Sequence, residues 1–547
     1  MKLKTLLTSA TLALVLPNAM AVPAKPGIHT FTQPDGTVIE ASLVGDEHFH
    51  YYRMADGTEL LRDADGFLRK ADASQILSMQ NKAMAREATM PGTIRQTFPT
   101  TGTVRGLIIM AEFQDKKFLP KTTREYIDTK VNSENFVSDE ALGSVVDYFR
   151  EQSGGAFTPV FDVVGPVTLP KKCADYGLNE DLVNFYRDAC IAADTQAGVD
   201  FSLYDVNNDD FVDFVFVIFA GHGEAQGGSS DCIWPAMMYL ENSVYDYFDD
   251  KNLNVAACAC ELKDAEGEEW DGVGTICHEF SHILGLPDVY DARYSGGYGM
   301  GHYDMMDVGP YNADGRIPAG YTAMDRYTVG WLDPVVLSEP AKDVELPSLV
   351  ESNKAYFIVN PDNADEYYTL ENRQPVGFDA GLPGHGLIIS HIHYDPKIWS
   401  RNTVNSPSQS GYEHIQLMAA DNKWVANPAG EAADPFPGTG GVTEFTDDTT
   451  PAATWHTGSS AKVGKPVTNI RENSDGLITF DFDILNSGIS RPGTAEETGI
   501  SGGRGFIIAP RDARIYTLAG IETTRTGLAP GIYLVKTADR YTKVIVR

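Results

Sequence analysis

The chain has 547 residues, of which 76 are Asp or Glu and 43 are Lys or Arg, giving a formal net charge of −33. So negative a protein repels nucleic acid and anionic membrane surfaces, and we expect neither as a partner. Its length and its hydrophobic fraction of 42% favour several globular domains, each with its own core.

The N-terminus has the features of a secretory signal peptide. Two lysines precede an apolar run over residues 6–16, and a small-x-small cleavage sequence follows at 19–21. This run is too short, and wrongly flanked, for a membrane anchor, and no later apolar run is long enough to span a bilayer. We therefore expect a chain that is secreted or displayed at the cell surface without membrane insertion, with a mature start near Val22.

Residues 27–73 alternate short strand-like segments with turn signals such as Pro34-Asp35-Gly36, and a helical stretch follows within residues 74–98. This pattern predicts a small antiparallel module. Its position before the central region favours a pro-domain that covers the active site until it is cleaved. The module contains no cysteine, so a carboxylate or steric cover would have to maintain latency. The alternative is an ordinary accessory module.

From Thr103 onwards the pattern changes to long buried strands and amphipathic helices. Residues 104–110 and 211–219 are apolar and predict strands, and residues 144–152 predict a helix. We expect an α/β (α+β) catalytic domain here. All six cysteines lie within it, so any disulfides would brace this region alone.

The segment D-V-N-N-D-D-F-V-D carries oxygen side chains at Asp205, Asn207, Asp209 and Asp213. This spacing is typical of calcium loops, because hard cations bind many oxygen atoms. The usual glycine is absent from position six, and the usual glutamate from position twelve. A calcium site and a solvated acidic loop remain two interpretations of these residues.

Residues 278–288 read H-E-F-S-H-I-L-G-L-P-D. Residues four apart share one face of a helix, so His278 and His282 can bind one zinc ion, while Glu279 can accept a proton from its bound water. The glycine and proline that follow end the helix and bring Asp288 back as a third ligand. Two nitrogen ligands, one oxygen ligand and an open position suit catalytic zinc. The alternative is a pair of packed core histidines.

A methionine-containing turn, H-Y-D-M-M-D at residues 302–307, follows the zinc motif. A methionine there would supply an apolar floor beneath the metal. His302 or Tyr303 can donate a hydrogen bond to the oxyanion, and Tyr303 is our candidate. The alternative is a packed loop without catalytic contact.

Three further histidines have other environments. His222 ends a strand in a glycine-flanked turn and is a candidate for lining the cleft. His391 and His393 are two apart on a predicted strand. A structural or substrate-facing role fits them better than metal binding, because no carboxylate and third histidine complete a ligand set.

Beyond residue 334 the sequence is rich in strands and turns, as at 355–359, 367–370 and 386–390, and predicts a β-sandwich packed against the catalytic domain. Residues 487–503 have the composition of a flexible linker, and a small β module follows.

Taken together, the chain resembles the immune-inhibitor-A-like family of secreted bacterial zinc metalloproteases over residues 103–485. The segments that carry this resemblance are 104–113, 144–153, 209–224, the zinc motif, 303–306, 330–331, 370–373 and 383–388. The resemblance implies a metzincin-like plan with His278 and His282 as zinc ligands, Glu279 as general base and Asp288 as third ligand. Most metzincins have a histidine in place of Asp288.

The final segment is similar to the sorting domain of type nine secretion in the Bacteroidetes, on residues 515–520, 528–535 and 543–546. This similarity implies passage across an outer membrane by a secretion machinery that recognises the C-terminus.

We therefore predict a secreted zinc metalloendopeptidase that hydrolyses protein or peptide substrates, with Zn²⁺ as its cofactor and Ca²⁺ as a second one if the acidic loop at 205–213 is a calcium site. The alternative is a catalytically spent surface-binding protein that uses its β-rich half, although the intact Glu279 argues against it. The predicted units are a signal peptide at 1–21, a pro-domain at 22–98, a catalytic domain at 99–334, a β-rich domain at 335–485, a linker at 486–502 and a sorting-like β module at 503–547.

Overall fold

The structure is a computed structural model. It describes residues 19–63, 65–88, 94, 96–137, 141–177, 181–240, 243–244, 246–424, 427–484, 501–502, 507–509, 513–517, 521–537 and 541–546. The predicted signal peptide up to residue 18 and the predicted linker up to residue 500 lie outside these residues. Within the described part of the chain, no helix combines the length and the apolar character needed to cross a bilayer.

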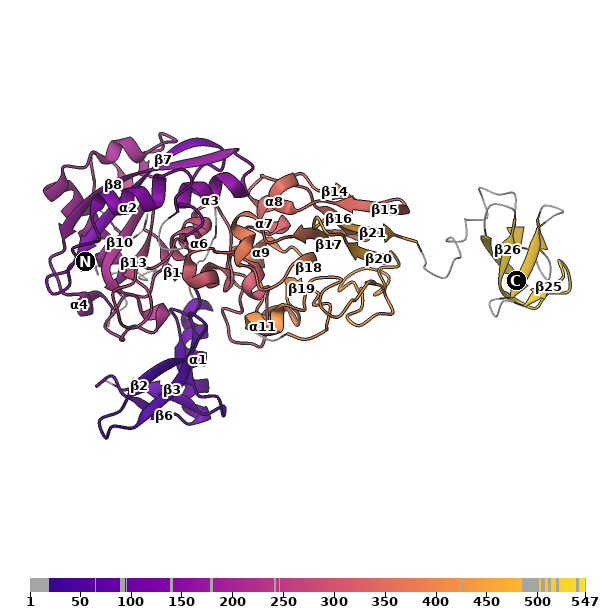
Figure 1. Ribbon diagram of the computed structural model, residues 1–547, viewed down its shortest axis with the longest axis horizontal. Helices are drawn as coiled ribbons and strands as arrows, with labels where there is room; N and C mark the ends of the chain where they lie inside the picture. The colour runs from indigo at the N-terminus through magenta and orange to yellow at the C-terminus, as the bar shows by residue number, and fades with distance from the viewer. Residues whose placement is uncertain are drawn as a thin grey trace, which may run out of the picture.

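The N-terminal module is an antiparallel sheet followed by one helix (Figure 1). Its elements are β2 His29–Thr32, β3 Val38–Gly45, β4 His50–Arg53, β5 Glu59–Arg62, β6 Leu68–Lys70 and α1 Ala73–Ala88. The turn between β2 and β3 lies at the predicted Pro34-Asp35-Gly36, where Gly36 has φ +83° and Thr37 donates its N–H to the Asp35 carboxylate. Leu43, Tyr52 and Leu60 share a core with the central sheet, so the module packs against the central region.

The central region is built on a six-stranded sheet of order β1-β11-β13-β10-β7-β8. The strands are β1 Ala19–Met20, β7 Gly102–Glu112, β8 Phe157–Thr168, β10 Val215–His222, β11 Met237–Tyr239 and β13 Val255–Leu262. Strands β8, β7, β10 and β13 are parallel, β11 runs antiparallel to β13, and β1 runs antiparallel to β11.

Helices cover both faces of this sheet, because alternate strand residues are apolar on either side. Ile108 and Ile218 face one core, which α2, α3 and α6 close, whereas Leu107 and Val217 face the other, which α4 and α5 close. The helices are α2 Arg124–Asn132, α3 Val145–Gln152, α4 Cys173–Gly177, α5 Leu182–Ala192, α6 Gly274–Ile283 and α7 Ala323–Thr328. The mixed α/β architecture predicted for this region is therefore confirmed.

The prediction of one continuous strand over residues 211–219 is wrong, because the strand is interrupted. The structure forms two strands, β9 Phe211–Val212 paired with β12 Asn252–Leu253, and β10, which starts at Val215. Asp213 is fully buried and its carboxylate accepts from the Val206 N–H at 2.7 Å, which turns the chain between them.

The second domain consists of two facing sheets that share one core, with orders β14-β16-β17-β18-β19 and β15-β21-β20. Its strands are β14 Val335–Val336, β15 Ala341–Leu346, β16 Tyr356–Asn360, β17 Asn363–Arg373, β18 Gly386–His393, β19 Ile415–Leu417, β20 Val467–Glu472 and β21 Ile478–Phe482. Short helices lie in its loops: α8 Leu349–Ser352, α9 Pro396–Trp399, α10 Pro407–Ser410 and α11 Pro428–Glu431.

The described residues of the C-terminal module form two small antiparallel sheets, drawn in yellow in Figure 1. Their strands are β22 Ser501–Gly502, β23 Ile507–Ile508, β24 Arg514–Thr517, β25 Glu522–Thr523, β26 Gly531–Lys536 and β27 Tyr541–Val546. Ile515, Val535 and Val544 form part of its own core.

Candidate metal centre and peptide cleft

The H-E-x-x-H motif lies on α6, which is buried along its whole length. Gly274 allows the helix to pack closely on the chain at Pro310, because a Cβ there would lie 1.9 Å from the Pro310 carbonyl oxygen. Gly285 has φ +100° and turns the chain out of the helix. The sequence pattern and the local backbone therefore agree on where the helix ends.

Three donor atoms converge beside this helix. Oδ1 of Asp288 lies 3.2 Å from Nε2 of His278 and 3.4 Å from Nε2 of His282. All three side chains are buried, and these three atoms have no hydrogen-bond partner among the described residues. Donor atoms bound to one tetrahedral ion at about 2.0–2.1 Å lie roughly 3.3 Å apart. The spacing of these atoms, their chemical type and their lack of hydrogen-bond partners among the described residues therefore fit one metal ion.

The second nitrogen of each imidazole fixes its orientation. Nδ1 of His278 donates to the Met305 carbonyl oxygen at 2.8 Å, and Nδ1 of His282 donates to the Leu286 carbonyl oxygen at 2.8 Å. Both rings thus present an unprotonated Nε2 to the metal position. Burial lowers the pKa of His278 more than Asp288 raises it, which favours the neutral, metal-binding form.

Asp288 is held as a carboxylate. Burial raises its pKa, but the neighbouring imidazoles of His282 and His278 outweigh this, and the pKa lies well below its usual value. The side-chain amide of Asn402 donates to Oδ2 of Asp288, and the Asp288 N–H donates to Oδ1 of Asn402 at 2.7 Å. Asn402 belongs to the second domain and orients the ligand from outside. No local sequence pattern identifies it, because it lies 114 residues from its partner.

Glu279 is buried beside the donor atoms. Its Oε1 accepts from the Val22 N–H at 2.9 Å, and its Oε2 has no hydrogen-bond partner among the described residues. Burial raises the pKa of this carboxyl well above its ordinary value, although the Val22 N–H partly lowers it. A carboxylate with a raised pKa in this position is suited to accept and return a proton near neutral pH.

An extended N-terminal segment passes over this centre. Ala19 and Met20 pair antiparallel with Met238 and Met237 of β11, which would be the edge strand of the sheet without them. The segment adds a strand to the sheet, as bound peptides do at exposed sheet edges. Residues 21 and 22 are fully buried at the metal centre.

Three aromatic side chains hold the carbonyl groups of this segment. The Tyr290 hydroxyl donates to the Ala21 oxygen at 2.8 Å, the Trp234 indole to the Val22 oxygen at 2.9 Å, and the Tyr311 hydroxyl to the Pro23 oxygen at 2.7 Å. The Ala21–Val22 peptide bond is therefore held with its oxygen at Tyr290 and its nitrogen at Glu279. Tyr290 follows Asp288 by only two residues, but it belongs to no sequence motif that marks it as a site residue.

Tyr303 is not among these groups. Its hydroxyl donates to the Glu431 carbonyl oxygen at 2.9 Å and is buried against the second domain. His302 contacts the Glu431 carboxylate through Nδ1 at 2.8 Å. Met305 is fully buried and supports His278 through its carbonyl oxygen.

The four candidate calcium residues lie in one tight turn. The Asp205 carboxylate accepts from the Asp209 and Asp210 N–H groups and from the Lys251 ammonium at 2.8 Å. Asp213 accepts from Asn207 at 2.9 Å. Hydrogen bonds and one lysine therefore engage these oxygen atoms, and calcium binding stays a prediction.

A helix that carries H-E-x-x-H, followed after a glycine turn by a carboxylate within reach of both histidines, is the pattern typical of metal-dependent peptidases. Residues 111–332 match the family described as the immune inhibitor A peptidase M6 catalytic domain. The three donor residues and Glu279 lie inside this segment, which is therefore similar to a metallopeptidase catalytic domain.

Two curated relatives are similar to parts of the chain. Immune inhibitor A of Bacillus thuringiensis subsp. alesti is 33% identical over 187 residues, covering 27% of this chain and 26% of that protein. Pre-pro-metalloprotease PrtV of Vibrio cholerae serotype O1 (strain M66-2) is 25% identical over 211 residues, covering 34% of this chain and 22% of that protein. The chain spans about a quarter of the length of these relatives.

Proposed function

We propose that this protein is a secreted zinc-dependent endopeptidase that hydrolyses protein substrates. The observation that carries the proposal is the set of three buried donor atoms on His278, His282 and Asp288, which have no hydrogen-bond partner among the described residues. Two imidazole nitrogens and one carboxylate oxygen suit zinc better than magnesium or calcium, and three protein ligands are the number that catalytic zinc sites use. Relatives named immune inhibitor A and pre-pro-metalloprotease support the same function.

The geometry around the Ala21–Val22 bond supports roles for two side chains. A zinc ion at the three donors supplies Lewis acidity, which polarises a carbonyl group and lowers the pKa of a water molecule. Glu279 accepts the proton of the attacking water and returns it to the leaving nitrogen, whose position the Val22 nitrogen occupies. The Tyr290 hydroxyl stabilises the negative charge that develops on the carbonyl oxygen, because it already donates to the corresponding Ala21 oxygen.

Residues 22–98 act as a pro-domain in this proposal. The segment after Ala21 lies in the cleft as a peptide substrate would, which supports latency by main-chain cover. Among the described residues, the group able to hold a metal contains no side chain of this module. If export removes residues 1–21, the new α-amino group of Val22 stands beside Glu279. The C-terminal β module is proposed to direct export across the outer membrane and takes no part in catalysis.

The test uses the purified full chain, matured by limited proteolysis, with casein as substrate. We expect cleavage that stops with 1,10-phenanthroline and returns with Zn²⁺, and about one zinc ion per chain. Glu279→Ala should keep the zinc and lose roughly 10²–10⁴-fold in rate, the usual worth of an acid–base step. Cleavage that survives in this variant contradicts the mechanism. A zinc-loaded protein that binds protein ligands but cuts none supports the spent surface-binding alternative.

A further inference from the structure

The N-terminal segment assigns substrate positions to the cleft. If the Ala21–Val22 bond occupies the place of the scissile bond, then Val22, Pro23, Ala24 and Lys25 occupy the first four positions after it. The segment keeps main-chain contact over this length, since the Tyr311 hydroxyl binds the Pro23 oxygen and the Lys25 N–H donates to the Ala225 carbonyl oxygen at 2.8 Å. Its side chains therefore report which chemistry each position accepts.

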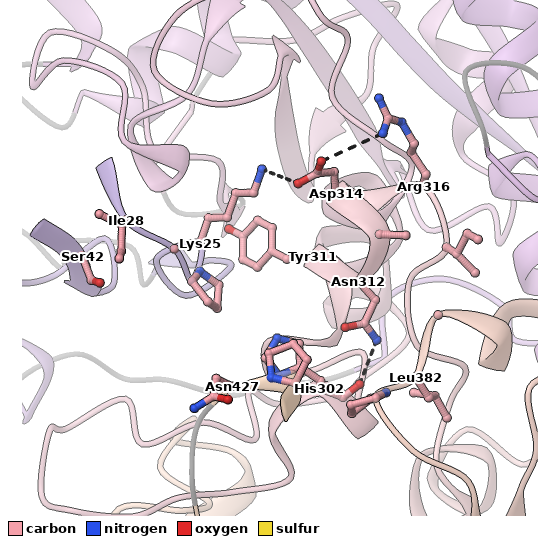
Figure 2. Close-up of a pocket in the computed structure, with 17 residues that line it drawn as sticks. Lys25, Ile28, Ser42, His302, Tyr311, Asn312, Asp314, Arg316, Leu382 and Asn427 are labelled. Atoms are coloured by element: carbon pink, nitrogen blue, oxygen red, sulfur yellow. Dashed lines mark hydrogen bonds and ion pairs between the residues drawn. The ribbon is translucent and has the colours of Figure 1, made fainter. Parts of the chain in front are cut away.

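Lys25 is the one charged residue among these four, and it is 8% exposed. Its ammonium lies 2.6 Å from Oδ1 of Asp264 and 3.1 Å from Oδ1 of Asp314. A buried lysine is costly unless its charge is paired, so these two carboxylates determine where the side chain can rest. Figure 2 shows Lys25 reaching past the ring of Tyr311 to Asp314.

The charges around this contact do not balance without Lys25. Two other cations lie there: Lys263 contacts Glu269 at 2.7 Å, Asp314 at 3.1 Å and Asp264 at 3.9 Å. Arg316 contacts Glu269 at 3.6 Å and Asp314 at 4.0 Å, the latter contact being drawn in Figure 2. Three carboxylates thus face two fixed cations. When the segment leaves, the site carries one uncompensated negative charge.

The acidic pair is held in place by the catalytic domain itself. The Asp264 N–H donates to Oε1 of Gln226 at 3.2 Å, and Nδ1 of His222 donates to its carbonyl oxygen at 3.0 Å. Asp314 follows Ala313, and both have φ near +50° (57° and 49°), a conformation that fixes the turn presenting the carboxylate. His222, which the sequence marked as a cleft residue, is therefore a positioning residue for Asp264.

Space for a longer peptide adjoins this contact. A cavity of about 950 Å³ is lined by Lys25 and Asp314 on one side and by His302, Leu382 and Asn427 on the other. In Figure 2 the Lys25 and Asp314 side chains stand at one edge of this space. Both Asp264 and Asp314 keep close to half of their side chains exposed with Lys25 bound, so a substrate can reach them.

We infer that Asp264 and Asp314 form a subsite that selects substrates with Lys or Arg at the fourth residue after the scissile bond. The inference rests on the proposed endopeptidase function. The pro-domain uses the same subsite through Lys25, so its release exchanges an internal lysine for a basic residue of the substrate.

The test compares quenched fluorescent peptides that differ only at this fourth position, with Lys, Gln or Glu. For the matured enzyme we expect kcat/KM for the Lys peptide to exceed that for the Gln peptide by roughly three- to tenfold, and the Glu peptide to be slowest, as for a partly exposed ion pair. The doubly substituted Asp264→Asn, Asp314→Asn enzyme should cut Lys and Gln peptides equally. Glu266→Gln removes one charge from the same loop, away from Lys25, and should keep the preference.

A binding measurement separates this inference from the function itself. Matured Glu279→Ala protein is titrated with a labelled peptide of residues 22–29, or with the same peptide carrying Gln at the position of Lys25, by fluorescence anisotropy. We expect the Lys peptide to bind roughly three- to tenfold more tightly, and the gap to shrink with salt. Equal binding and equal cleavage of the Lys and Gln peptides overturn the inference. A lysine preference in binding without cleavage of any peptide upholds the subsite and rejects the peptidase.

Discussion

Two pairs of closely spaced histidines, one on α6 and one on β18, differ in the hydrogen bonds that their ring nitrogens make. On α6, the Nδ1 atoms of His278 and His282 donate to backbone carbonyl groups, and their Nε2 atoms, next to Asp288, have no hydrogen-bond partner in the part of the chain that the structure describes. On β18, His391 spends Nε2 on the Glu366 carboxylate at 2.9 Å, and His393 bonds the Tyr412 hydroxyl at 2.7 Å. Both regions contain two histidines close together, but the buried ring nitrogens that lack a hydrogen-bond partner among the described residues of these two pairs belong to His278 and His282.

The carboxylates of the two regions differ in the same way. Oδ1 of Asp288 has no hydrogen-bond partner among the residues that the structure describes, whereas the Glu366 carboxylate also accepts from Asn360 and Thr457. Burial raises the pKa of Glu366, but His391 and Thr457 outweigh it and hold this pKa well below its usual value. A candidate metal site therefore differs from a structural hydrogen-bond network less in its residue types than in having buried polar atoms without hydrogen-bond partners.

Replacing one histidine of each pair should have the largest effect and should affect the two regions differently. His278→Ala should reduce bound zinc from about one ion per chain to about none and abolish cleavage, because two ligands hold zinc poorly. His391→Ala should keep the zinc and lower the free energy of unfolding by about 1–3 kcal/mol, because Glu366 loses a buried partner. Metal analysis and thermal unfolding of both variants measure this, and loss of zinc from His391→Ala would contradict it.

Within the metal region, two tyrosines sharpen the assignment of the oxyanion donor. Tyr290→Phe should lower kcat roughly 10²-fold while zinc content and KM change little, because the lost hydrogen bond matters most in the transition state. Tyr303→Phe is the matched control and should stay within about twofold of the unchanged enzyme, because its hydroxyl bonds Glu431. Steady-state kinetics on a peptide substrate give both values, and the reverse order would assign the role to Tyr303.

Removing the contact that Asn402 of the second domain makes with Asp288 should have a smaller effect than the tyrosine substitution. Asn402→Ala removes both hydrogen bonds that orient Asp288 and should weaken zinc affinity about 10–100-fold, the usual worth of such a contact. Competition with a fluorescent zinc chelator measures the change. Asn405→Ala is a nearby control that bonds only backbone groups, and an equal loss of affinity there would point to general loosening of the loop.

The smallest effect is expected at the contact between the N-terminal module and the catalytic domain. Nε2 of His50 lies 3.1 Å from Oε1 of Glu224. Burial lowers the pKa of His50, but Glu224 outweighs it and the pKa lies above its ordinary value. The His50–Glu224 ion pair therefore stabilises the contact between the two units fully below a pH of roughly 6.5. This stabilisation is lost as the pH rises through the raised pKa of His50.

Maturation by limited proteolysis should accordingly speed up by roughly two- to threefold on going from mildly acidic to alkaline pH, as for an ion pair worth under about 1 kcal/mol. His50→Gln should remove this part of the pH dependence. The rate of release of residues 22–98 across a pH series measures it, and an unchanged profile in the variant would exclude His50.

Features that depend on residues close together in the sequence could be predicted from it, whereas those that depend on distant residues could not. The metal donors lie within eleven residues, and helix periodicity with one glycine turn is enough to bring His278, His282 and Asp288 together. The strand break at Asp213 depends on a buried side chain that the apolar run around it conceals. Tyr290 and Asn402 gain their roles only through the segment at Ala21 and through the second domain. The Val22 contact to Glu279 joins residues 257 apart, and no local pattern encodes it.

The most direct test of the central claim is anomalous diffraction at the zinc edge from crystals of the zinc-loaded full chain. The account predicts one strong peak about 2.0–2.2 Å from Nε2 of His278, Nε2 of His282 and Oδ1 of Asp288. A peak at the histidines of β18, or no peak in protein that still cleaves casein, would contradict it.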